Sequence, residues 1–425
     1  METEPLGAGP LGNPLDIDTV VVGGGQAGLA ASYFLSRAGV GHVIFDKRAA
    51  LGGAWQDRWD AFVLNTPNLA LNMPGLPYSG TEPDAFMARD DVVDYFREYA
   101  RRIDAPVRTG TDVTRVSASD GGFNVETSDG TWRARNVVLA TGGFQMPKIP
   151  PVASDLPRDI VQLHADQYRN PAQLPGGAVL VVGTGQSGVQ IAEELLAAGR
   201  QVHLAVSTCP EAPRRYRGRD TLYWVLQTGL HGPEYGVNAL RVQQLPSPAA
   251  RFGCNPLLSG SDGGHDIRLR ELGRSGMRLH GHLEAAHDGE LVFTDDLAER
   301  LATVESGFSQ RMQRALDAYI AAAGIDAPPA EVRATDDWLP EEPARLDLAS
   351  ENISSVLWAT GYRLDLNFVD LPVLDQWSYP RHERGVTEHP GLFVVGLPWL
   401  TGHYSALIGG VGVDAEYVAA CVAGR

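Results

Sequence analysis

The sequence predicts an α/β fold with two Rossmann-like dinucleotide-binding domains, because the same local pattern occurs twice in its 425 residues. "TVVVGGGQAGLAASYFLSRAG" occupies residues 19–39, and "VLVVGTGQSGVQIAEELLAAG" occupies residues 179–199. Each is an apolar, β-branched run followed by Gly-x-Gly-x-x-Gly and a helical pattern that ends at glycine. A hydrophobic fraction of 44% and alternating strand-like and helix-like segments also fit a globular α/β protein.

The elements expected in the first part of the chain begin with a strand at 19–22, a helix at 26–37 and a strand at 42–46. A Pro/Gly/Asn-rich segment at 65–83 is too irregular for regular structure. A helix over 89–103, a β-meander over 113–143 and an extended linker over 144–157 follow.

The second part begins with the repeated unit at residue 179. The segment from 210 to 343 shows one helical pattern, at 297–323. Buried strands return at 354–362 and 391–398, before a final helix.

The composition limits the classes of partner. The formal net charge of −17 disfavours a nucleic acid or an anionic membrane surface, because both require a basic face. No apolar run is long enough for a spanning helix, and the acidic start "METEPLGAGPLGNPLD" lacks the features of a signal peptide. Cys209, Cys254 and Cys421 form no close pair and no metal-ligand spacing, so we expect a cytoplasmic protein without a metal site.

Both Gly-rich turns have the residue types that bind a pyrophosphate. The first glycine permits the tight turn, the second lets the backbone approach the phosphates, and the third lets helix and strand pack closely. The phosphates then meet the free N–H groups and the positive end of the helix dipole. The expected contacts are Gly23, Gly25, Gln26, Ala27 and Gly28 in the first turn, and Gly183, Gly185, Gln186, Ser187 and Gly188 in the second.

The two units differ where the next strand ends. "HVIFDK" places Asp46, followed by Lys47, where a carboxylate suits the ribose hydroxyls of an adenosine. The corresponding "QVHLAVST" carries no acid, and "PRRYRGRD" downstream supplies Arg214 and Arg215. This pattern favours a 2′-phosphate, so FAD at the first turn and NADPH at the second are the simplest pair of cofactors. A solvated surface patch is the alternative interpretation of the arginines.

Four further motifs resemble those of the class B flavin-dependent monooxygenases, which include flavin-containing and Baeyer–Villiger monooxygenases and short bacterial flavoproteins. The motifs are "LGGAWQDRW" at 51–59, "VVLATGG" at 137–143, "VLWATGY" at 356–362 and "GLFVVGLPWLTGHYSALIGGVGVDA" at 391–415. The resemblance implies an FAD-binding domain at 1–155 and 345–425, interrupted by an NADPH-binding domain with a helical insertion at 156–344. It also implies flavin contacts at Gly53, Trp55, Arg58, Thr141, Gly142 and Leu407.

The same resemblance assigns catalytic positions to Asn65 and Thr66, beside the reactive edge of the flavin. These residues are also good turn formers, so a turn is the alternative. The family's signature Phe-x-Gly-x-x-x-His, followed by an aromatic residue, is half kept in "RDIVQLHADQY", which retains His164 and Tyr168 but has Arg158 and Ile160 in place of Phe and Gly. His164 is either a signature residue or a structural histidine with satisfied hydrogen bonds.

The resemblance implies that NADPH reduces FAD, that reduced flavin reacts with O2 at C4a, and that the resulting (hydro)peroxide transfers one oxygen atom to a small organic substrate. Tyr168 resembles the aromatic residue of the heteroatom-oxygenating branch of the family, and this resemblance implies oxygenation at nitrogen or sulfur. The alternatives are an NADPH oxidase, a Baeyer–Villiger monooxygenase and a non-enzymatic redox or nucleotide sensor, and a homodimer is compatible with the family. A flavin disulfide reductase is disfavoured because it needs a redox-active cysteine pair.

Overall fold

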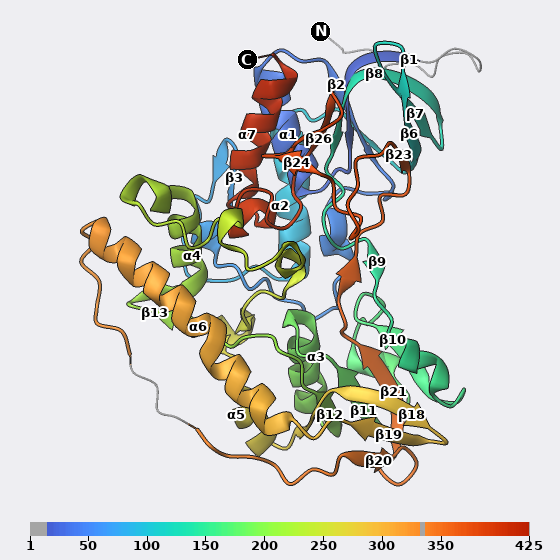
Figure 1. Cartoon of the computed structure of the whole chain (residues 1–425), viewed down its shortest axis with the longest axis vertical. Helices are drawn as coiled ribbons and strands as arrows, with labels where there is room; N and C mark the ends of the chain where they lie inside the picture. Colours follow the sequence, from blue (N-terminus) through green and yellow to red (C-terminus); the bar gives the residue numbers. More distant parts are fainter. Residues whose placement is uncertain (1–14, 332–335, 425) are drawn as a thin grey trace.

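The computed structural model describes residues 15–331 and 336–424, which form two bodies built on separate β-sheets (Figure 1). In the first sheet the order is β23-β6-β7-β8-β1-β2-β5, with β26 on β8 and with β25 and β24 beyond it. β1, β2, β5, β26 and the end of β8 run parallel, whereas β6, β7 and β8 form the expected antiparallel meander. Its strands are β1 (Leu15–Val22), β2 (His42–Asp46), β5 (Val107–Thr109), β6 (Val113–Ser119), β7 (Gly122–Thr127), β8 (Gly130–Leu139), β23 (Val369–Asp370), β24 (His382–Glu383), β25 (Val386–Thr387) and β26 (Leu392–Val394).

The second sheet is smaller and entirely parallel, in the order β10-β21-β11-β12-β17. Its strands are β10 (Val161–His164), β11 (Ala178–Val182), β12 (Val202–Ala205), β17 (Arg278–His280) and β21 (Ile353–Trp358). A separate antiparallel sheet comprises β18 (Leu283–His287), β19 (Glu290–Phe293) and β20 (Arg345–Asp347). Five buried residues in a row in β11 have the continuous apolar pattern of a strand covered on both faces.

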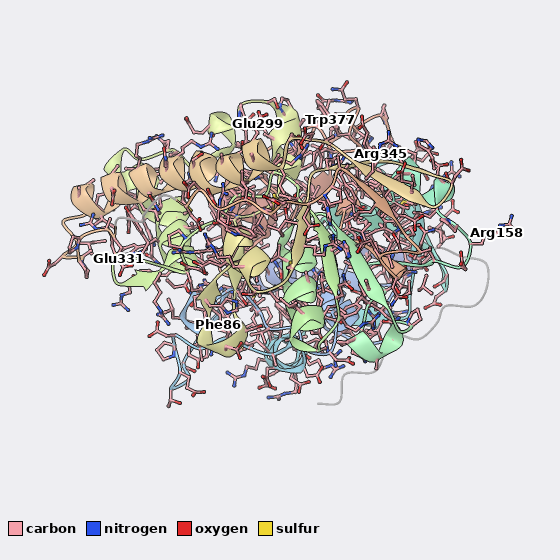
Figure 2. The ribbon with its side chains drawn as sticks, turned by 90° about the horizontal axis from the view of Figure 1, so that it is seen from below. Phe86, Arg158, Glu299, Glu331, Arg345 and Trp377 are labelled. Atoms are coloured by element: carbon pink, nitrogen blue, oxygen red, sulfur yellow. A yellow bond between two sulfur atoms is a disulfide. The ribbon has the colours of Figure 1, made fainter. Side chains whose placement is uncertain are left out.

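Helices cover both sheets. The seven α-helices of the described residues are α1 (Gln26–Arg37), α2 (Arg89–Arg102), α3 (Gln186–Ala197), α4 (Thr221–His231), α5 (Leu269–Arg274), α6 (Leu297–Ala322) and α7 (Val411–Val422). α1 and α7 lie side by side on the first sheet, and α6 runs along one side of the molecule as a long helix (Figures 1 and 2). No helix in the described ranges is both long and apolar enough to cross a membrane.

The two bodies are joined by two chain segments that pair with each other. β9 (Met146–Pro147) on the way out is antiparallel to β22 (Tyr362–Arg363) on the way back. The predicted division at 155/156 and 344/345 stays a prediction. Because β20 and β21 pair with strands of the second body, the pairing favours a return point just after Trp358.

The expected elements are observed with small differences. The segment 65–83 contains η2 (Asn68–Ala70) and a short hairpin of β3 (Asn72–Met73) and β4 (Leu76–Pro77), and the linker contains η3 (Pro151–Asp155). Between 210 and 343, the additional elements of the described residues are α4, α5, β17, β18, β19, β13 (Arg215–Tyr216), β14 (Arg219–Asp220), β15 (Leu258–Ser259), β16 (His265–Asp266), η5 (Gly232–Tyr235), η6 (Val242–Gln244), η7 (Pro248–Phe252) and η8 (Ser261–Gly263).

The prediction that the cysteines form no pair is wrong. Cys209 and Cys254 are joined by a disulfide, with 5.7 Å between their Cα atoms and a sequence separation of 45. The loop after β12 meets the loop before β15, as the hydrogen bond from Leu257 N to Pro210 O records. The sequence does not reveal such a meeting, because both loops lack periodicity. The separation of the cysteines along this chain therefore does not indicate a reducing compartment.

Candidate functional site: two dinucleotide-binding turns

The first Gly-rich turn is closed at its outer glycines and open at its middle one. Gly23 has φ +107°, and a Cβ there would lie 2.6 Å from the carbonyl oxygen of Ala140. A Cβ at Gly28 would lie 1.9 Å from the Gly23 oxygen, whereas one at Gly25 would meet nothing closer than Gly53 Cα at 3.9 Å. No side chain caps α1, so the N–H groups of its first turn are directed at the space beside Gly25. This geometry fits a pyrophosphate.

The second turn repeats these contacts. Gly183 has φ +103° and its Cβ would lie 2.7 Å from the oxygen of Ala359, while a Cβ at Gly188 would lie 2.1 Å from the Gly183 oxygen. A Cβ at Gly185 would meet no atom within 4 Å, and α3 likewise has no side-chain cap. Each "ATG" motif therefore supports one Gly-rich turn, and the half-buried Ser187 lies in the first turn of α3.

The ends of the second strands differ in charge. In the first unit, Gly24 N donates to Asp46 Oδ2 at 2.7 Å, and the exposed Lys47 follows. Gly23 N bonds Phe45 O and Gly183 N bonds Ala205 O, so Val206 is the structural equivalent of Asp46. The cap in the second unit is neutral: Thr184 N donates to Ser207 Oγ at 3.2 Å. The described structure thus has no carboxylate at this position of the second turn.

Gln26 connects three segments around the first turn. Its Nε2 donates to Ala406 O at 2.7 Å, and its Oε1 accepts from Trp55 Nε1 at 3.2 Å. The Gly53–Trp55 segment and the C-terminal segment that ends at Leu407 are thereby held beside Gly25. Ala27 is buried against Gly396, where a Cβ would come within 2.3 Å of the Ala27 methyl.

Gln186 is the equivalent residue of the second unit and has a different partner. Its Oε1 accepts from Leu258 N at 3.1 Å, and its Nε2 donates to Leu258 O. Residues 254–260, here called the wall segment, are thus bonded to the N-terminus of α3. At the other end of the wall segment, a Cβ at Gly260 would lie 2.1 Å from Leu64 O, so this segment lies directly between the two units.

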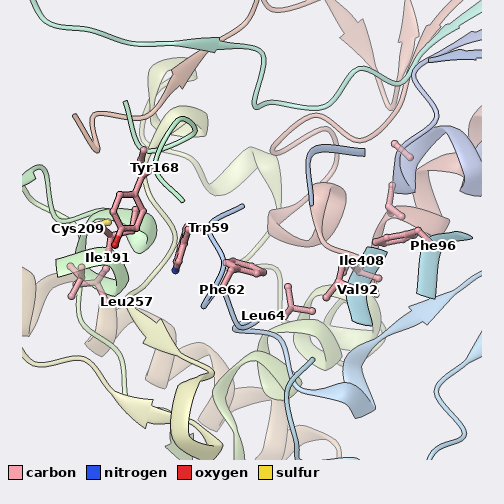
Figure 3. Packing of buried hydrophobic residues seen from close by; sticks show 14 of the residues in the cluster. Trp59, Phe62, Leu64, Val92, Phe96, Tyr168, Ile191, Cys209, Leu257 and Ile408 are labelled. Carbon is pink, nitrogen blue, oxygen red and sulfur yellow. The ribbon is translucent and has the colours of Figure 1, made fainter. Parts of the chain in front are cut away.

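The predicted catalytic residues lie at this junction. The carbonyl oxygen of Asn65 accepts a hydrogen bond from Arg214 Nη1 at 2.8 Å, and Thr66 is buried. Figure 3 shows that the chain from Trp59 to Leu64 passes between Tyr168 and Leu257 on one side and Val92 and Ile408 on the other.

Arg214 is directed inward. Its side chain is 3% exposed and forms an ion pair with Asp220 at 2.5 Å, and burial lowers the pKa of its guanidinium. Arg215 is exposed on β13. The hairpin that carries Arg215 is bonded to α6 by an ion pair between Arg217 and Asp317 at 3.0 Å. The loop after β12 contacts the same helix at Val304, which lies 13 residues before Asp317, or about 20 Å away along the helix axis. Arg214 is thus engaged within the protein, whereas Arg215 lies on the surface of the hairpin.

Arg58 is half-buried where the two linking segments cross. Its guanidinium lies over the rings of Trp55, Phe62 and Phe144, the last at 4.9 Å. Burial lowers its pKa, and Tyr362 is the first of the groups that oppose this shift. Nearby, Thr141 Oγ1 and Gly142 O both accept from Gln145 Nε2 at 2.7 Å, which fixes the outgoing linker.

His164 has a structural role in this arrangement. Its Nδ1 lies 2.8 Å from Asp166 and its Nε2 lies 3.0 Å from Gly361 O, so both ring nitrogens have partners. Tyr168 is fully buried in the core between the units. Arg158, one of the two residues that depart from the family signature, is exposed at the edge of the molecule (Figure 2).

A buried polar network in the C-terminal segment was not predicted from the sequence. Thr401 Oγ1 donates to Asp414 Oδ1 at 2.6 Å and lies 2.9 Å from Tyr404 Oη, which accepts from Arg241 at 2.5 Å. Burial raises the pKa of Asp414. Burial also lowers the pKa of His403, the residue before Tyr404, to about 4, so the His403 imidazole is neutral at pH 7. Only the motif "LTGHYSALIGG" marked this region, without indicating its partners.

Comparisons with known proteins agree with this geometry. The family model described as pyridine nucleotide-disulphide oxidoreductase matches residues 20–227. A CzcO-like oxidoreductase from Geobacillus kaustophilus is 31% identical over 95% of this chain and 97% of its own. The chain belongs to the CzcO-like oxidoreductases. The expected oxidoreductase class and α/β fold are confirmed.

Two further relatives connect this family to flavin enzymes. The indole-3-pyruvate monooxygenase YUCCA1 of Oryza sativa is 30% identical over 48% of this chain and 51% of its own. The flavin-containing monooxygenase of Stenotrophomonas maltophilia has the same fold, with a TM-score of 0.67 at 21% identity over 96% of this chain and 99% of its own. The predicted resemblance is thus confirmed, and the predicted cofactors, FAD and a nicotinamide dinucleotide, agree with these relatives.

Proposed function

We propose that the protein is an NADPH-dependent FAD monooxygenase that transfers one oxygen atom from O2 to nitrogen or sulfur of a small organic molecule. The observation that carries the proposal is the pair of equivalent turns, each with an open middle glycine and an uncapped helix N-terminus. The sequence similarity to a monooxygenase over 48% of the chain supports the reaction class.

In this proposal the first turn holds FAD. Gly23, Gly25 and Gly28 shape the turn, the N–H groups of Gln26 and Ala27 meet the pyrophosphate, and Asp46 and Lys47 lie at the adenosine end. When bound, the flavin would supply hydride acceptance and reaction with O2. The Gly53–Trp55 segment, Thr141, Gly142 and Leu407 would surround its other end.

The second turn holds NADPH through Gly183, Gly185, Gln186, Ser187 and Gly188. Val206 supports the choice of NADPH over NADH, because an apolar side chain there does not repel a 2′-phosphate as a carboxylate would. Arg215 is retained as the candidate phosphate contact, and Arg214 has a structural role in holding Asn65.

Asn65 and Thr66 orient the substrate and O2 at the junction of the units. Buried aromatic side chains exclude water there, among them Trp59, Phe62 and Tyr168. Arg58 supplies a positive charge of low solvation nearby, and the neutral His403 offers a polar group without charge. A nucleophilic nitrogen or sulfur needs no base to attack an electrophilic oxygen, which favours these atoms over a ketone.

The test is NADPH-driven oxygen uptake with panels of amines, sulfides, ketones and indoles under ¹⁸O₂. We expect one labelled oxygen on nitrogen or sulfur of a product. A labelled ester or lactone would indicate a Baeyer–Villiger monooxygenase, labelled hydrogen peroxide alone an oxidase, and no NADPH consumption a sensor.

A flavin disulfide reductase is a second candidate, because the Cys209–Cys254 disulfide supplies the cysteine pair that the sequence analysis did not find. An aromatic disulfide such as dithiobis-nitrobenzoate, reduced at the expense of NADPH under nitrogen, would support this candidate. Loss of that activity in Cys254→Ser, with oxygen uptake retained, would assign it to this pair.

A cytoplasmic location and a homodimer complete the proposal.

A further inference from the structure

The Cys209–Cys254 disulfide joins one buried cysteine to one exposed cysteine. Cys209 is fully buried in the core shared with Ile191 and Leu257, whereas Cys254 is exposed (Figure 3). A thiolate from solution therefore reaches Cys254 first, because access selects which sulfur is attacked. The arrangement suits opening from the outside, with Cys209 as the leaving group.

The wall segment connects this disulfide to the second turn. Cys209 Sγ lies 3.6 Å from Asn255 O, and Leu257 N donates to Pro210 O at 2.8 Å. The next residue, Leu258, makes both hydrogen bonds to Gln186 at the N-terminus of α3. Leu258, which is bonded to the residue at the proposed phosphate site, therefore lies four positions after the exposed Cys254.

The same segment also reaches the first unit. Ser259 O accepts from Arg214 Nη1 at 3.3 Å, the same nitrogen that donates to Asn65 O. Gly260 packs directly on Leu64 O. A rearrangement of the wall segment would thus alter its contacts with Gln186 at the second turn and with Leu64 in the first unit.

We propose that the Cys209–Cys254 disulfide is a thiol-reactive clip that holds the wall segment against Gln186, and that its reduction by a dithiol weakens dinucleotide binding at the second turn. This inference rests on the proposed assignment of NADPH to that turn. Cross-linking restricts the loop that the two cysteines close, and reduction returns conformational freedom to the wall segment.

The exchange is balanced with a dithiol as the reductant. One thiolate of the dithiol attacks Cys254 Sγ, the Cys209–Cys254 bond breaks, and Cys209 leaves as a thiolate that takes up a proton. The second thiol of the dithiol then attacks the dithiol sulfur that is bonded to Cys254, and Cys254 is released as a thiol. Two electrons and two protons pass to the protein, and the dithiol becomes a cyclic disulfide.

The experiment compares oxidised and dithiothreitol-reduced flavoprotein, with the state of each cysteine read by alkylation and mass spectrometry. We expect the Kd for NADP⁺ to rise about fivefold or more on reduction, in the range typical of coupled sites. Amide hydrogen exchange at residues 255–259 should accelerate on reduction in nucleotide-free protein. Cys254→Ser should resemble the reduced state without dithiol, and Cys421→Ser, which alters a free cysteine outside the pair, should respond like wild type.

The variant Gln186→Ala distinguishes an effect of the disulfide that acts through Gln186 from a general loosening of the protein on reduction. In this variant the Kd should be high already and should no longer respond to dithiol, because the bonds to Leu258 are gone. Faster exchange on reduction with no NADP⁺ binding in either state would support the clip and contradict the proposed function of the turn. Equal exchange and equal Kd in both states, or failure of Cys209 and Cys254 to form a disulfide under air, would overturn the inference.

Discussion

The two Gly-rich turns have the same backbone and different neighbours. In both, the first glycine packs on the carbonyl of an "ATG" alanine and the third packs on the first, within a few tenths of an ångström of the same distances. The glutamine that follows is bonded to Trp55 and Ala406 in the first unit and to Leu258 in the second. Glycine spacing thus sets the backbone geometry of each turn, whereas the partners of Gln26 and Gln186 determine which other segments are held beside it.

The largest expected effect is loss of one cofactor at a time. Gly28→Ala places a Cβ 1.9 Å from a backbone oxygen, and Gly188→Ala places one at 2.1 Å, so neither turn can keep its shape. Gly28→Ala should yield colourless protein, whereas Gly188→Ala should remain yellow and lose NADP⁺ binding. The measurements are flavin absorbance per protein after gel filtration and titration calorimetry.

Gly41→Ala and Gly176→Ala are the matched controls, because a Cβ at either position meets no atom within 4 Å. Loss of flavin from Gly188→Ala would show that the two turns do not act independently.

The second expected effect is the acid sensitivity that a buried histidine pair gives the second sheet. His203 on β12 and His280 on β17 stack at 5.3 Å, whereas the residue equivalent to His203 in the first sheet is the apolar Val43. Burial lowers the pKa of His203 to about 4 and of His280 to about 3, and Arg278 contributes to both shifts while Glu351 opposes that of His203. The unfolded chain, with ordinary histidines near pKa 6.5, therefore binds more protons below that pH.

The free energy of unfolding should thus be highest above pH 6.5 and decrease as the pH falls toward 4. Between pH 7 and pH 5 the pair should account for about 2–4 kcal/mol of that decrease. Urea unfolding at both pH values checks this, against a double variant with glutamine at 203 and 280. An equal pH dependence in the double variant would contradict the buried, neutral state of the pair.

The contacts that the sequence predicted are mainly those within one βαβ unit. Glycine spacing, the apolar strands and Asp46 are local patterns, and the structure contains each of them as expected. The Cys209–Cys254 disulfide, the Gln186–Leu258 bonds and the Thr401–Asp414 network were not predicted. Their partners lie on loops without periodicity or far apart in the chain, so no local pattern encodes the contact. Arg214 shows the same limit, because its buried partner Asp220 outweighs the apparent basic cluster around it.

The third effect concerns the strand ends, where Asp46 and Val206 occupy equivalent positions. Val206→Asp introduces a carboxylate beside the proposed 2′-phosphate, and we expect the Kd for NADPH to rise about tenfold to a hundredfold with a smaller change for NADH. Val206→Asn, which has a similar shape without the charge, is the control. An unchanged ratio of the Kd values for NADPH and NADH would show that this strand end does not lie beside the ribose.

The smallest expected effect tests why Gln26 has two partners. Trp55→Phe removes the donor to Gln26 Oε1, a bond of 3.2 Å, but keeps an aromatic ring near Phe62 and Arg58. A single hydrogen bond of this kind contributes about 1 kcal/mol, or about a fivefold change in the Kd for FAD. The bond from Gln26 Nε2 to Ala406 O is retained, so the C-terminal segment should stay in place.

Trp377→Phe, at a side chain that is 37% exposed, should leave FAD binding unchanged. The measurement is flavin fluorescence on dilution, with Gln26→Leu as the variant that loses both bonds. If Trp55→Phe holds FAD like wild type while Gln26→Leu releases it, then the bond to Ala406 alone organises the first turn, and Gln26, like Gln186, acts by holding one distant loop.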